Sequence, residues 1–300
     1  MNLSKHHIKS LNKALSYIDK NLESDVSLDK ISKIAHYSPF HFHRIFKVFT
    51  NETLNQYSSR KRIEKAAAVL LRKKDVTISE LSLQFGFTSN SSFTRAFKTF
   101  YGVNPSDFRK QGKGTYSKIL QVKSKNSQPS ANFETYVCDT NQNTAYMQSH
   151  IEVKSIGAIH TIGASCIGTN NVSSTFQNVM TWAGPKGLLR QPHFKMATIY
   201  YDSFKITAPD KVRMRACLLI DEPIKTDGDM STVTINEGKH IIAHHEININ
   251  EFERIWTELF MWMNTNGYNM RNEPPFEIYH NDFNTHPKKI CVVDLYVPVA

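Results

Sequence analysis

Two stretches of the chain, residues 27–57 and 77–108, show the same order of hydrophobic and polar positions. Matched pairs at an offset of 50 are Leu28 and Ile78, Ile31 and Leu81, and Tyr37 and Phe87. Matched pairs at an offset of 51 are Ser38 and Ser89, Phe42 and Phe93, Arg44 and Arg95, Phe46 and Phe97, and Lys47 and Lys98. The one-residue shift falls where we expect a turn, and turns tolerate insertions best. We infer an internal duplication.

Each copy predicts two short helices joined by a tight turn. The expected helix starts are Thr77 with Glu80, Ser38 with Pro39, and Ser89. These are a capping box, a hydroxyl N-cap followed by proline at the first helical position, and the matching hydroxyl cap. Gly86 stands where the chain leaves a helix and needs a left-handed residue. His36 takes that place in the first copy. The pattern is that of a helix-turn-helix, used twice.

The second helix of each copy divides into an apolar face and a polar face. Residues expected in the core are Phe42, Ile45, Phe46 and Phe49, and then Phe93, Ala96, Phe97 and Phe100. The remaining outward residues are Phe40, His43, Arg44 and Lys47, and then Asn90, Ser91, Thr94, Arg95 and Lys98. Arginine can pair with guanine, asparagine with adenine, and apolar groups with the thymine methyl. The alternative is a merely solvated surface, which matching arginines in both copies disfavour.

Two further amphipathic helices belong to the same half. One is marked by Ile8, Leu11, Leu15, Ile18 and Leu22. The other covers residues 55–73 and joins the two copies. We expect its basic residues to be exposed and to contact phosphates, which position a protein without reading sequence. They are Arg60, Lys61, Lys65, Arg72 and Lys73.

The second half contains a fainter repeat, in which a helix is preceded by alternating strand-like positions and followed by two more strands. Residues 176–187 align with 256–267 at an offset of 80, and residues 199–204 align with 278–283 at an offset of 79. The preceding strand-like stretches are residues 151–167 and 232–249. We therefore predict a duplicated β-α-β-β unit around a pseudo-two-fold groove. The expected fold class is two domains, an all-α N-terminal domain and an α+β C-terminal domain.

Composition sets the domain boundaries and the compartment. Residues 111–144 are rich in Gly, Ser, Asn and Gln, which favours a flexible linker between domains at 1–110 and 145–300, with short strands as the alternative. The absence of an 18-residue apolar run predicts no membrane contact. Four cysteines without a CxxC pair and a start without a signal-peptide core favour a cytoplasmic protein with reduced thiols.

Charge is divided unevenly between the halves. Residues 1–125 hold 23 Lys and Arg against 9 Asp and Glu, a net charge of +14, whereas residues 126–300 hold 14 against 18, a net charge of −4. We therefore expect the first half alone to meet a polyanion.

Residues 5–110 resemble the DNA-binding domain of the AraC/XylS family, in which two helix-turn-helix units are joined by a long helix. The resemblance implies a transcription regulator, an activator, with double-stranded DNA and RNA polymerase as partners, no cofactor and no enzymatic activity. Carried over by position, the base-reading residues are Phe40, His43 and Arg44, and then Asn90, Ser91, Ser92, Thr94 and Arg95. Lys47 and Lys98 complete the expected DNA contacts.

Residues 145–300 resemble the GyrI-like effector-binding domain, through the doubled unit and the ending PPFEIYHNDFNTHPKKICVVDLYVPV. The resemblance implies a small-molecule effector and a groove-facing glutamate, here Glu277. Alternation independently places Glu277 and Tyr279 on one strand face. With Tyr200 or Tyr201 and Trp182 or Trp256 nearby, this carboxylate suits a lipophilic cation. The alternatives are a solvated Glu277 and tryptophans that only pack the core.

Other motifs are weak. His41 and His43 on a helix point about 200° apart, and His244 and His245 on a strand point to opposite faces, so we expect no metal site. Neither a nucleophile elbow nor a P-loop nor a zinc-protease motif occurs, and no catalytic residue is assigned. The leading hypothesis is a regulator controlled by a small cationic or lipophilic molecule. The alternative is a DNA-binding protein whose second domain is a small-molecule hydrolase or a protein-contact module.

Overall fold

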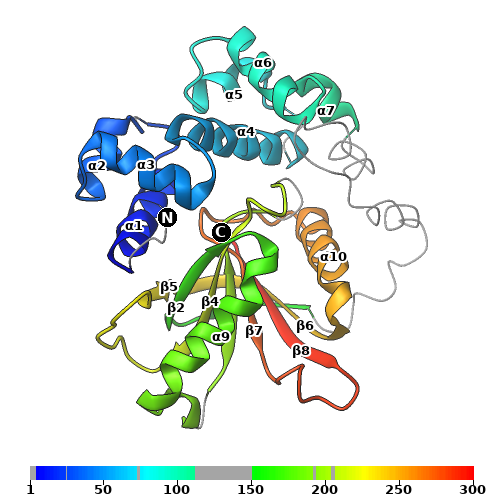
Figure 1. The fold of residues 1–300 in the computed structure, drawn as a ribbon. Coiled ribbons are helices and arrows are strands. Elements are labelled where there is room, and N and C mark those ends of the chain that lie inside the picture. Colours follow the sequence, from blue (N-terminus) through cyan, green and yellow to red (C-terminus); the bar gives the residue numbers. More distant parts are fainter. Residues whose placement is uncertain (1–4, 25, 73–74, 112–150, 192–193, 204–206) are drawn as a thin grey trace. The chain divides into compact units, whose positions relative to one another are not determined.

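The computed structural model describes the chain except for residues 1–4, 25, 73–74, 112–150, 192–193 and 204–206 (Figure 1). The chain divides into two compact units, the first made of the helices before residue 112 and the second of the strands and helices after residue 150. Nearly all of the expected linker, residues 111–144, lies outside the described residues. No described helix is both long and apolar enough to cross a membrane.

All regular secondary structure among the described residues of the first unit is helical. Its helices are α1 (Lys5–Lys20), α2 (Leu28–Ile34), α3 (Pro39–Thr50), α4 (Leu54–Arg72), α5 (Ile78–Gln84), α6 (Asn90–Tyr101) and α7 (Pro105–Gln111). One apolar core joins α1, α2 and α3, and a second joins α5, α6 and α7. The long helix α4 contributes Tyr57 to the first core and Ile63 to the second. The pairs α2–α3 and α5–α6 are the two helix-turn-helix units.

The helix starts and turns follow the residues that predicted them. The Ser38 hydroxyl accepts a hydrogen bond from the backbone of His41, and Thr77 forms a reciprocal capping box with Glu80. Both turns contain a left-handed residue, His36 at φ 61° and Gly86 at φ 69°. The duplication therefore extends to backbone geometry.

The basic residues of α4 differ from expectation. Arg60 and Lys61 were predicted to be exposed, but they are 6% and 5% exposed. The Arg60 guanidinium binds the Glu52 carboxylate at 2.8 Å and the Glu64 carboxylate at 3.0 Å. These ion pairs raise the pKa of Arg60, although burial opposes the charged form. Because α4 contributes to both cores, this face is covered by the protein, and the predicted phosphate contact at Arg60 is wrong.

Its neighbours on α4 also turn inward. The Lys61 ammonium lies 3.5 Å from the Asp19 carboxylate, and the Lys65 ammonium donates to the Asp19 carbonyl at 3.1 Å. These contacts tie α4 to α1, so the predicted phosphate contact at Lys61 is wrong as well. The Arg72 side chain and Lys73 lie outside the described residues.

The second unit is an eight-stranded antiparallel sheet with helices. Its strands are β1 (Ile151–Ile156), β2 (Ile159–Ile167), β3 (Met196–Tyr200), β4 (Arg213–Ile220), β5 (Ser231–Ile235), β6 (Gly238–Asn248), β7 (Phe276–Tyr279) and β8 (Ile290–Pro298). The long helices are α9 (Val172–Ala183) and α10 (Phe252–Thr265), and the short 3-10 turns are η1 (Thr169–Asn171), η2 (Gly184–Lys186), η3 (Leu188–Arg190) and η4 (Ile249–Glu251). The strand order is β1-β6-β8-β7-β3-β4-β2-β5.

The repeat is one strand longer than predicted, β-β-α-β-β in place of β-α-β-β. Each strand-like stretch before a helix breaks into two strands, β1 with β2 and β5 with β6. The two strands from one stretch are not hydrogen-bonded to each other. Instead, β1 pairs with β6, and β2 pairs with β5. Each repeat thus lends its first strand to the other, and the strand order reads the same from either end under the exchange of repeats.

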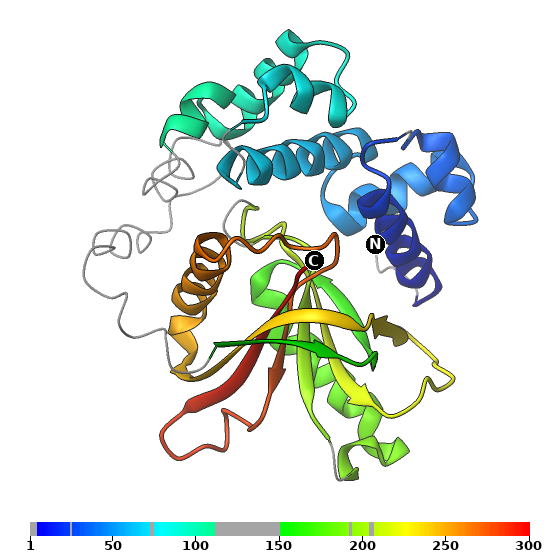
Figure 2. The same ribbon diagram turned by 180° about the vertical axis from the view of Figure 1, so that it is seen from behind.

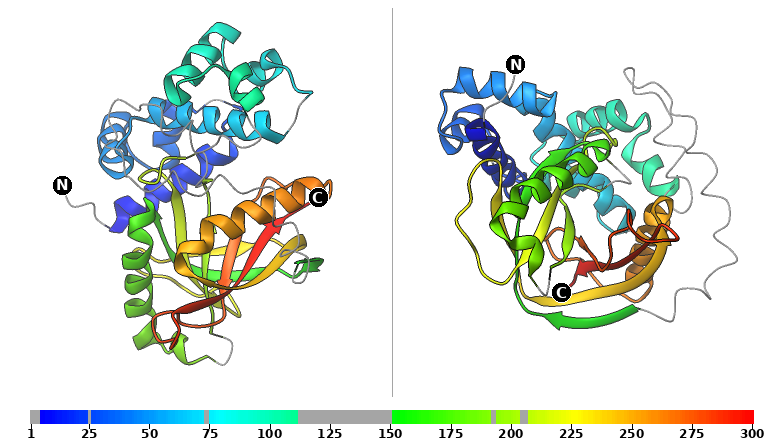
Figure 3. Two further views of the ribbon diagram at one scale, coloured as in Figure 1. Left: turned by 90° about the vertical axis from the view of Figure 1, so that its right-hand side faces the viewer. Right: turned by 60° about the horizontal axis from the view of Figure 1, so that its bottom comes forward.

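Both long helices cover the same face of the sheet (Figures 1 and 3). Helix α9 packs on β2 and β4, and α10 packs on β6. The central strands β3 and β7 pair at the junction of the two repeats, with Thr198 opposite Glu277. Figure 2, seen from behind, shows the other face, which carries an apolar cluster around Phe276, Ile199 and Tyr296.

Candidate nucleic-acid interface and buried carboxylate site

The outward face of α3 carries the residues predicted for the first helix-turn-helix. Phe40 is 82% exposed, and His43, Arg44 and Lys47 are exposed beside it. They border one shallow surface hollow together with Val48 and Asn51. An apolar ring, an imidazole and two cations therefore share one open surface.

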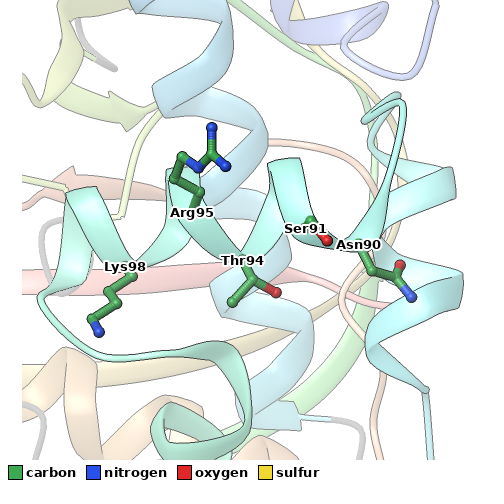
Figure 4. Close-up of a pocket in the computed structure, with 5 residues that line it drawn as sticks. All are labelled: Asn90, Ser91, Thr94, Arg95 and Lys98. Carbon is green, nitrogen blue, oxygen red and sulfur yellow. The ribbon is translucent and has the colours of Figure 1, made fainter.

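The corresponding face of α6 is equally open. Ser91, Arg95 and Lys98 are exposed and Thr94 is half-buried, and all four border a second shallow hollow. Figure 4 shows these side chains along the helix. Buried Phe93 and Phe97 hold the opposite side of α6 in the core, which fixes the direction of the polar face.

Two predicted residues of α6 already make hydrogen bonds within the protein. The Asn90 amide donates to the Ser79 hydroxyl at 2.6 Å and accepts from the Ser82 hydroxyl at 2.5 Å, which ties α6 to α5. The Ser92 hydroxyl accepts from the Ser89 backbone and donates to the Ser89 carbonyl, completing the N-terminal cap. Both side chains position the helix, and the other predicted residues of its outward face are Ser91, Thr94, Arg95 and Lys98.

Glu277 lies on β7 at the centre of the sheet and is fully buried. The Trp256 indole donates to one carboxylate oxygen at 2.5 Å, and the Tyr279 hydroxyl donates to the other at 2.5 Å. The Tyr200 hydroxyl supplies a third hydrogen bond. Burial excludes the alternative of a solvated Glu277.

Aromatic rings surround this carboxylate on the helix-covered face. The ring of Tyr200 lies 5.8 Å from that of Trp256, and the ring of Tyr279 lies 6.1 Å from that of Phe176 on α9 and 6.4 Å from that of Phe252 on α10. Both repeats thus contribute rings to one site. Edge-to-face arrangements of this kind present π-faces and C–H edges in several directions.

The electrostatics of Glu277 are unusual for a carboxylate. Burial raises its pKa from 4.5 to about 7, although the hydrogen bonds from Tyr279, Trp256 and Tyr200 favour the charged form. Burial, with the adjacent carboxylate, also raises the pKa of the Tyr200 hydroxyl. None of the described Lys, Arg or His residues forms an ion pair with Glu277. The site can therefore hold a proton or accept a cation.

The structure gathers only some of the residues predicted for this site. Tyr200, Trp256 and Tyr279 contact Glu277. Tyr201 points to the opposite face of the sheet, where the Arg213 guanidinium lies 4.4 Å from its ring centre. The Trp182 indole donates to the Asp227 carboxylate, with the Lys186 ammonium 4.8 Å from its ring centre. Trp182 and Tyr201 are therefore not brought to Glu277.

The sequence prediction also missed Phe176, Phe252 and Thr198. The Thr198 hydroxyl lies 2.7 Å from the Tyr279 hydroxyl. The repeat alignment carried a signal for two of the three. Phe176 aligns with Trp256 at the offset of 80, and Thr198 aligns with Glu277 at the offset of 79.

Comparison with known proteins divides the chain in the same way. Residues 149–300 match the family model of a GyrI-like small molecule binding domain, and residues 31–111 match that of a helix-turn-helix domain. The probable transcription factor PqrA of Proteus vulgaris is 35% identical over 104 residues, which are 34% of this chain and 84% of that protein. The multiple antibiotic resistance protein MarA of Escherichia coli K12 is 38% identical over 101 residues, which are 33% of this chain and 78% of that protein.

Among solved structures, the match to the EcmrR C-terminal domain covers 50% of this chain and 97% of that chain, with 16% identity and a TM-score of 0.42. The family descriptions are those of a helix-turn-helix domain and of a small molecule binding domain, and PqrA is named as a probable transcription factor. They agree with the expectation that the chain is not an enzyme.

Proposed function

Because this chain belongs to the AraC/XylS family of DNA-binding transcription regulators and carries a GyrI-like small-molecule-binding domain, we propose that a lipophilic cation bound at Glu277 is its effector. The observation that carries the proposal is the fully buried carboxylate surrounded by aromatic rings. A ligand that brings a positive charge and apolar surface suits both features.

The energetics favour a cationic guest over an anionic or neutral one. An ionised carboxylate loses several kcal/mol of solvation on burial, and neutral donors compensate only in part. The indole of Trp256 and the hydroxyls of Tyr200 and Tyr279 are all neutral donors. A cation would supply the missing counter-charge, and each desolvated ring contact adds roughly 0.5–2 kcal/mol. Entry requires at least one of these rings to move, because Glu277 is fully covered.

The test compares two ions of the same shape and opposite charge. We expect the full chain to bind tetraphenylphosphonium and not tetraphenylborate, measured by calorimetry. Glu277→Gln should weaken binding of the phosphonium ion by about 10- to 100-fold. This factor corresponds to the roughly 1.5–3 kcal/mol of a contact with a charged group. Glu222→Gln, on an exposed loop, is the matched control and should bind as the unaltered protein does. Equal binding of both ions, or an unaffected Glu277→Gln variant, would contradict the proposal.

For the first unit we propose that α3 and α6 enter two segments of the DNA major groove. Arg44 and Arg95 are the guanine-pairing candidates, helped by Phe40, His43, Ser91 and Thr94. Lys47 and Lys98 are placed to contact phosphates. We propose functional boundaries at 1–110 and 145–300, and RNA polymerase as the protein partner through which the bound regulator acts.

A further inference from the structure

Two histidines and an aspartate meet on the sheet of the second unit, on the face away from α9 and α10. The Asp294 carboxylate lies 2.6 Å from His244 Nδ1 through one oxygen and 2.7 Å from His280 Nε2 through the other. The three candidate ligand atoms all lie within 4.8 Å of one another. We propose that His244, His280 and Asp294 bind a divalent transition-metal ion such as Zn²⁺.

The backbone fixes the positions of all three residues. His244 on β6 is the direct cross-strand partner of Asp294 on β8, and Asp294 is also opposite Ile278 on β7. His280 follows β7 directly, and its amide donates to the Val292 carbonyl at 2.8 Å. Strands β6 and β8 and the residue directly after β7 therefore present the ligands. Sites on rigid elements lose less conformational entropy on binding than sites on loops.

A second layer of contacts supports the carboxylate. Tyr296 lies two residues beyond Asp294 on the same face of β8, and its side chain is hydrogen-bonded to the Asp294 carboxylate. Partners of this kind orient a ligating carboxylate. Tyr296 in turn stacks on Phe276, with ring centres 4.5 Å apart, which holds the hydroxyl in place.

The ligand chemistry selects the class of metal. Imidazole favours zinc, copper, nickel and iron, whereas magnesium and calcium prefer all-oxygen sites. Two imidazoles and one carboxylate leave at least one coordination position open. The side chains of His244 and His280 are 45% and 27% exposed, so an ion can reach the cluster and keep a water or a further ligand.

The competing explanation is a hydrogen-bonded His–Asp–His network that never binds metal. The two nitrogen–oxygen distances are those of hydrogen bonds, and a tetrahedral ion would widen them to about 3.3 Å, given metal–ligand bonds near 2.0–2.2 Å. That change is about 1 Å or less for each nitrogen–oxygen pair, and the two imidazole nitrogens, which lie within 4.8 Å of each other, would come to a similar separation. Exposed side chains can make it by small rotations, and the strands need not move.

The experiment measures Zn²⁺ uptake by the full chain, prepared without a polyhistidine tag and stripped with a chelator. Calorimetry should show one equivalent bound, and the ion should raise the melting temperature. His280→Gln and Asp294→Asn should lose this binding, with folding checked by circular dichroism. Asp294→Asn keeps the size of the side chain, so its loss of binding would reflect lost coordination. Tyr296→Phe should weaken binding by about 10- to 100-fold.

The matched control is His41→Gln in the first unit, where the rings of His7 and His41 lie 5.6 Å apart and offer a second histidine pair. It should leave the one-equivalent uptake unchanged. Failure of the unaltered chain to take up Zn²⁺, or full uptake by both His280→Gln and Asp294→Asn, would overturn the proposal. Loss of uptake in His41→Gln alone would place the ion elsewhere and overturn it equally.

Discussion

The carboxyl of Glu277 has a pKa raised to about 7, because burial penalises its charged form more than three hydrogen bonds favour that form. In the unfolded chain the same group titrates near its usual value of 4.5. Its contribution to folding is therefore most favourable below the unfolded value and is lost as the pH rises through the folded value. With a folded pKa of about 7, this carboxyl is only partly ionised at neutral pH, and the proposed cationic ligand would favour its charged form.

Glu277→Gln should therefore change how stability depends on pH. As the pH rises from about 4 to about 8, the unaltered chain should lose stability relative to the variant, by an amount of the order of a few kcal/mol. Urea unfolding of the second unit at several pH values measures this difference. The exposed Glu222→Gln variant should run parallel to the unaltered chain. A constant difference between Glu277→Gln and the unaltered chain across this range would show that Glu277 is ionised in the same way in both states.

Single residues also mark the limit of prediction for the site. Strand alternation was enough to place Glu277 and Tyr279 on one face, and burial then followed from the helices that cover that face. Alternation could not choose between Tyr200 and Tyr201, because that choice depends on which face each repeat turns toward α9 and α10. Trp182 was misplaced for a similar reason. It lies six residues beyond Phe176 on α9, about one and two-thirds turns, and it is the ring of Phe176 that lies beside Tyr279.

At the scale of elements, the helices were predictable and the strand pairing was not. Caps and turns are set by neighbouring residues, so Thr77, Ser38 and Gly86 specified their helices locally. The pairing of β1 with β6 joins residues far apart in the chain. One local feature marks the break between β1 and β2. Ile156 and Ile159 both face the same apolar cluster, although strict alternation would put them on opposite faces of one strand. Gly238, at φ 133°, is the first residue of β6 and ends the corresponding break between β5 and β6.

Helix α4 illustrates the same limit for polar residues. Its hydrophobic period identifies the apolar face correctly, but it cannot show that Arg60 is buried by partners from outside the helix as well as within it. Glu52 precedes α4, and Glu64 lies on α4 one turn beyond Arg60. Charge that looked available for DNA is instead paired with carboxylates before α4, on α4 and on α1.

Arg60→Ala should accordingly act on stability. Removing one partner of a buried ion pair leaves uncompensated charge, here on Glu52 and Glu64, and typically costs 3–5 kcal/mol. Urea denaturation followed by circular dichroism should show this loss in the helical unit. Lys9→Ala, on the exposed side of α1, is the control and should change stability by less than about 0.5 kcal/mol. An Arg60→Ala variant as stable as the control, with weakened DNA binding, would restore the phosphate-contact interpretation.

At the scale of the whole molecule, charge follows the division into two units. The net charge of +14 over residues 1–125 and of −4 over the remainder gives only the first unit an electrostatic attraction for DNA. Burial of Arg60 and Lys61 removes two of those charges from the accessible surface. The attraction then depends more heavily on Arg44, Lys47, Arg95 and Lys98, which are exposed on α3 and α6.

DNA binding by the full chain should therefore separate these residues into two classes. Arg44→Ala and Arg95→Ala should each cost roughly 1–3 kcal/mol at a selected site and relax the preference at one base position. Lys47→Gln and Lys98→Gln should weaken all sequences alike and reduce the slope of log K against log salt by about 0.9 each, one released counterion per phosphate contact. Site selection from random DNA followed by salt titrations measures both quantities.

Lys239→Gln, exposed on β6 of the second unit, is the control for charge alone and should leave the salt slope unchanged. A reduced slope in this variant would mean that the second unit also meets the DNA, against the division of charge. Full affinity and selectivity in both arginine variants would mean that α3 and α6 do not read bases. A salt slope that stays the same in both lysine variants would remove these lysines from the phosphate contacts, because exposed cations that touch no phosphate release no counterions when they are replaced.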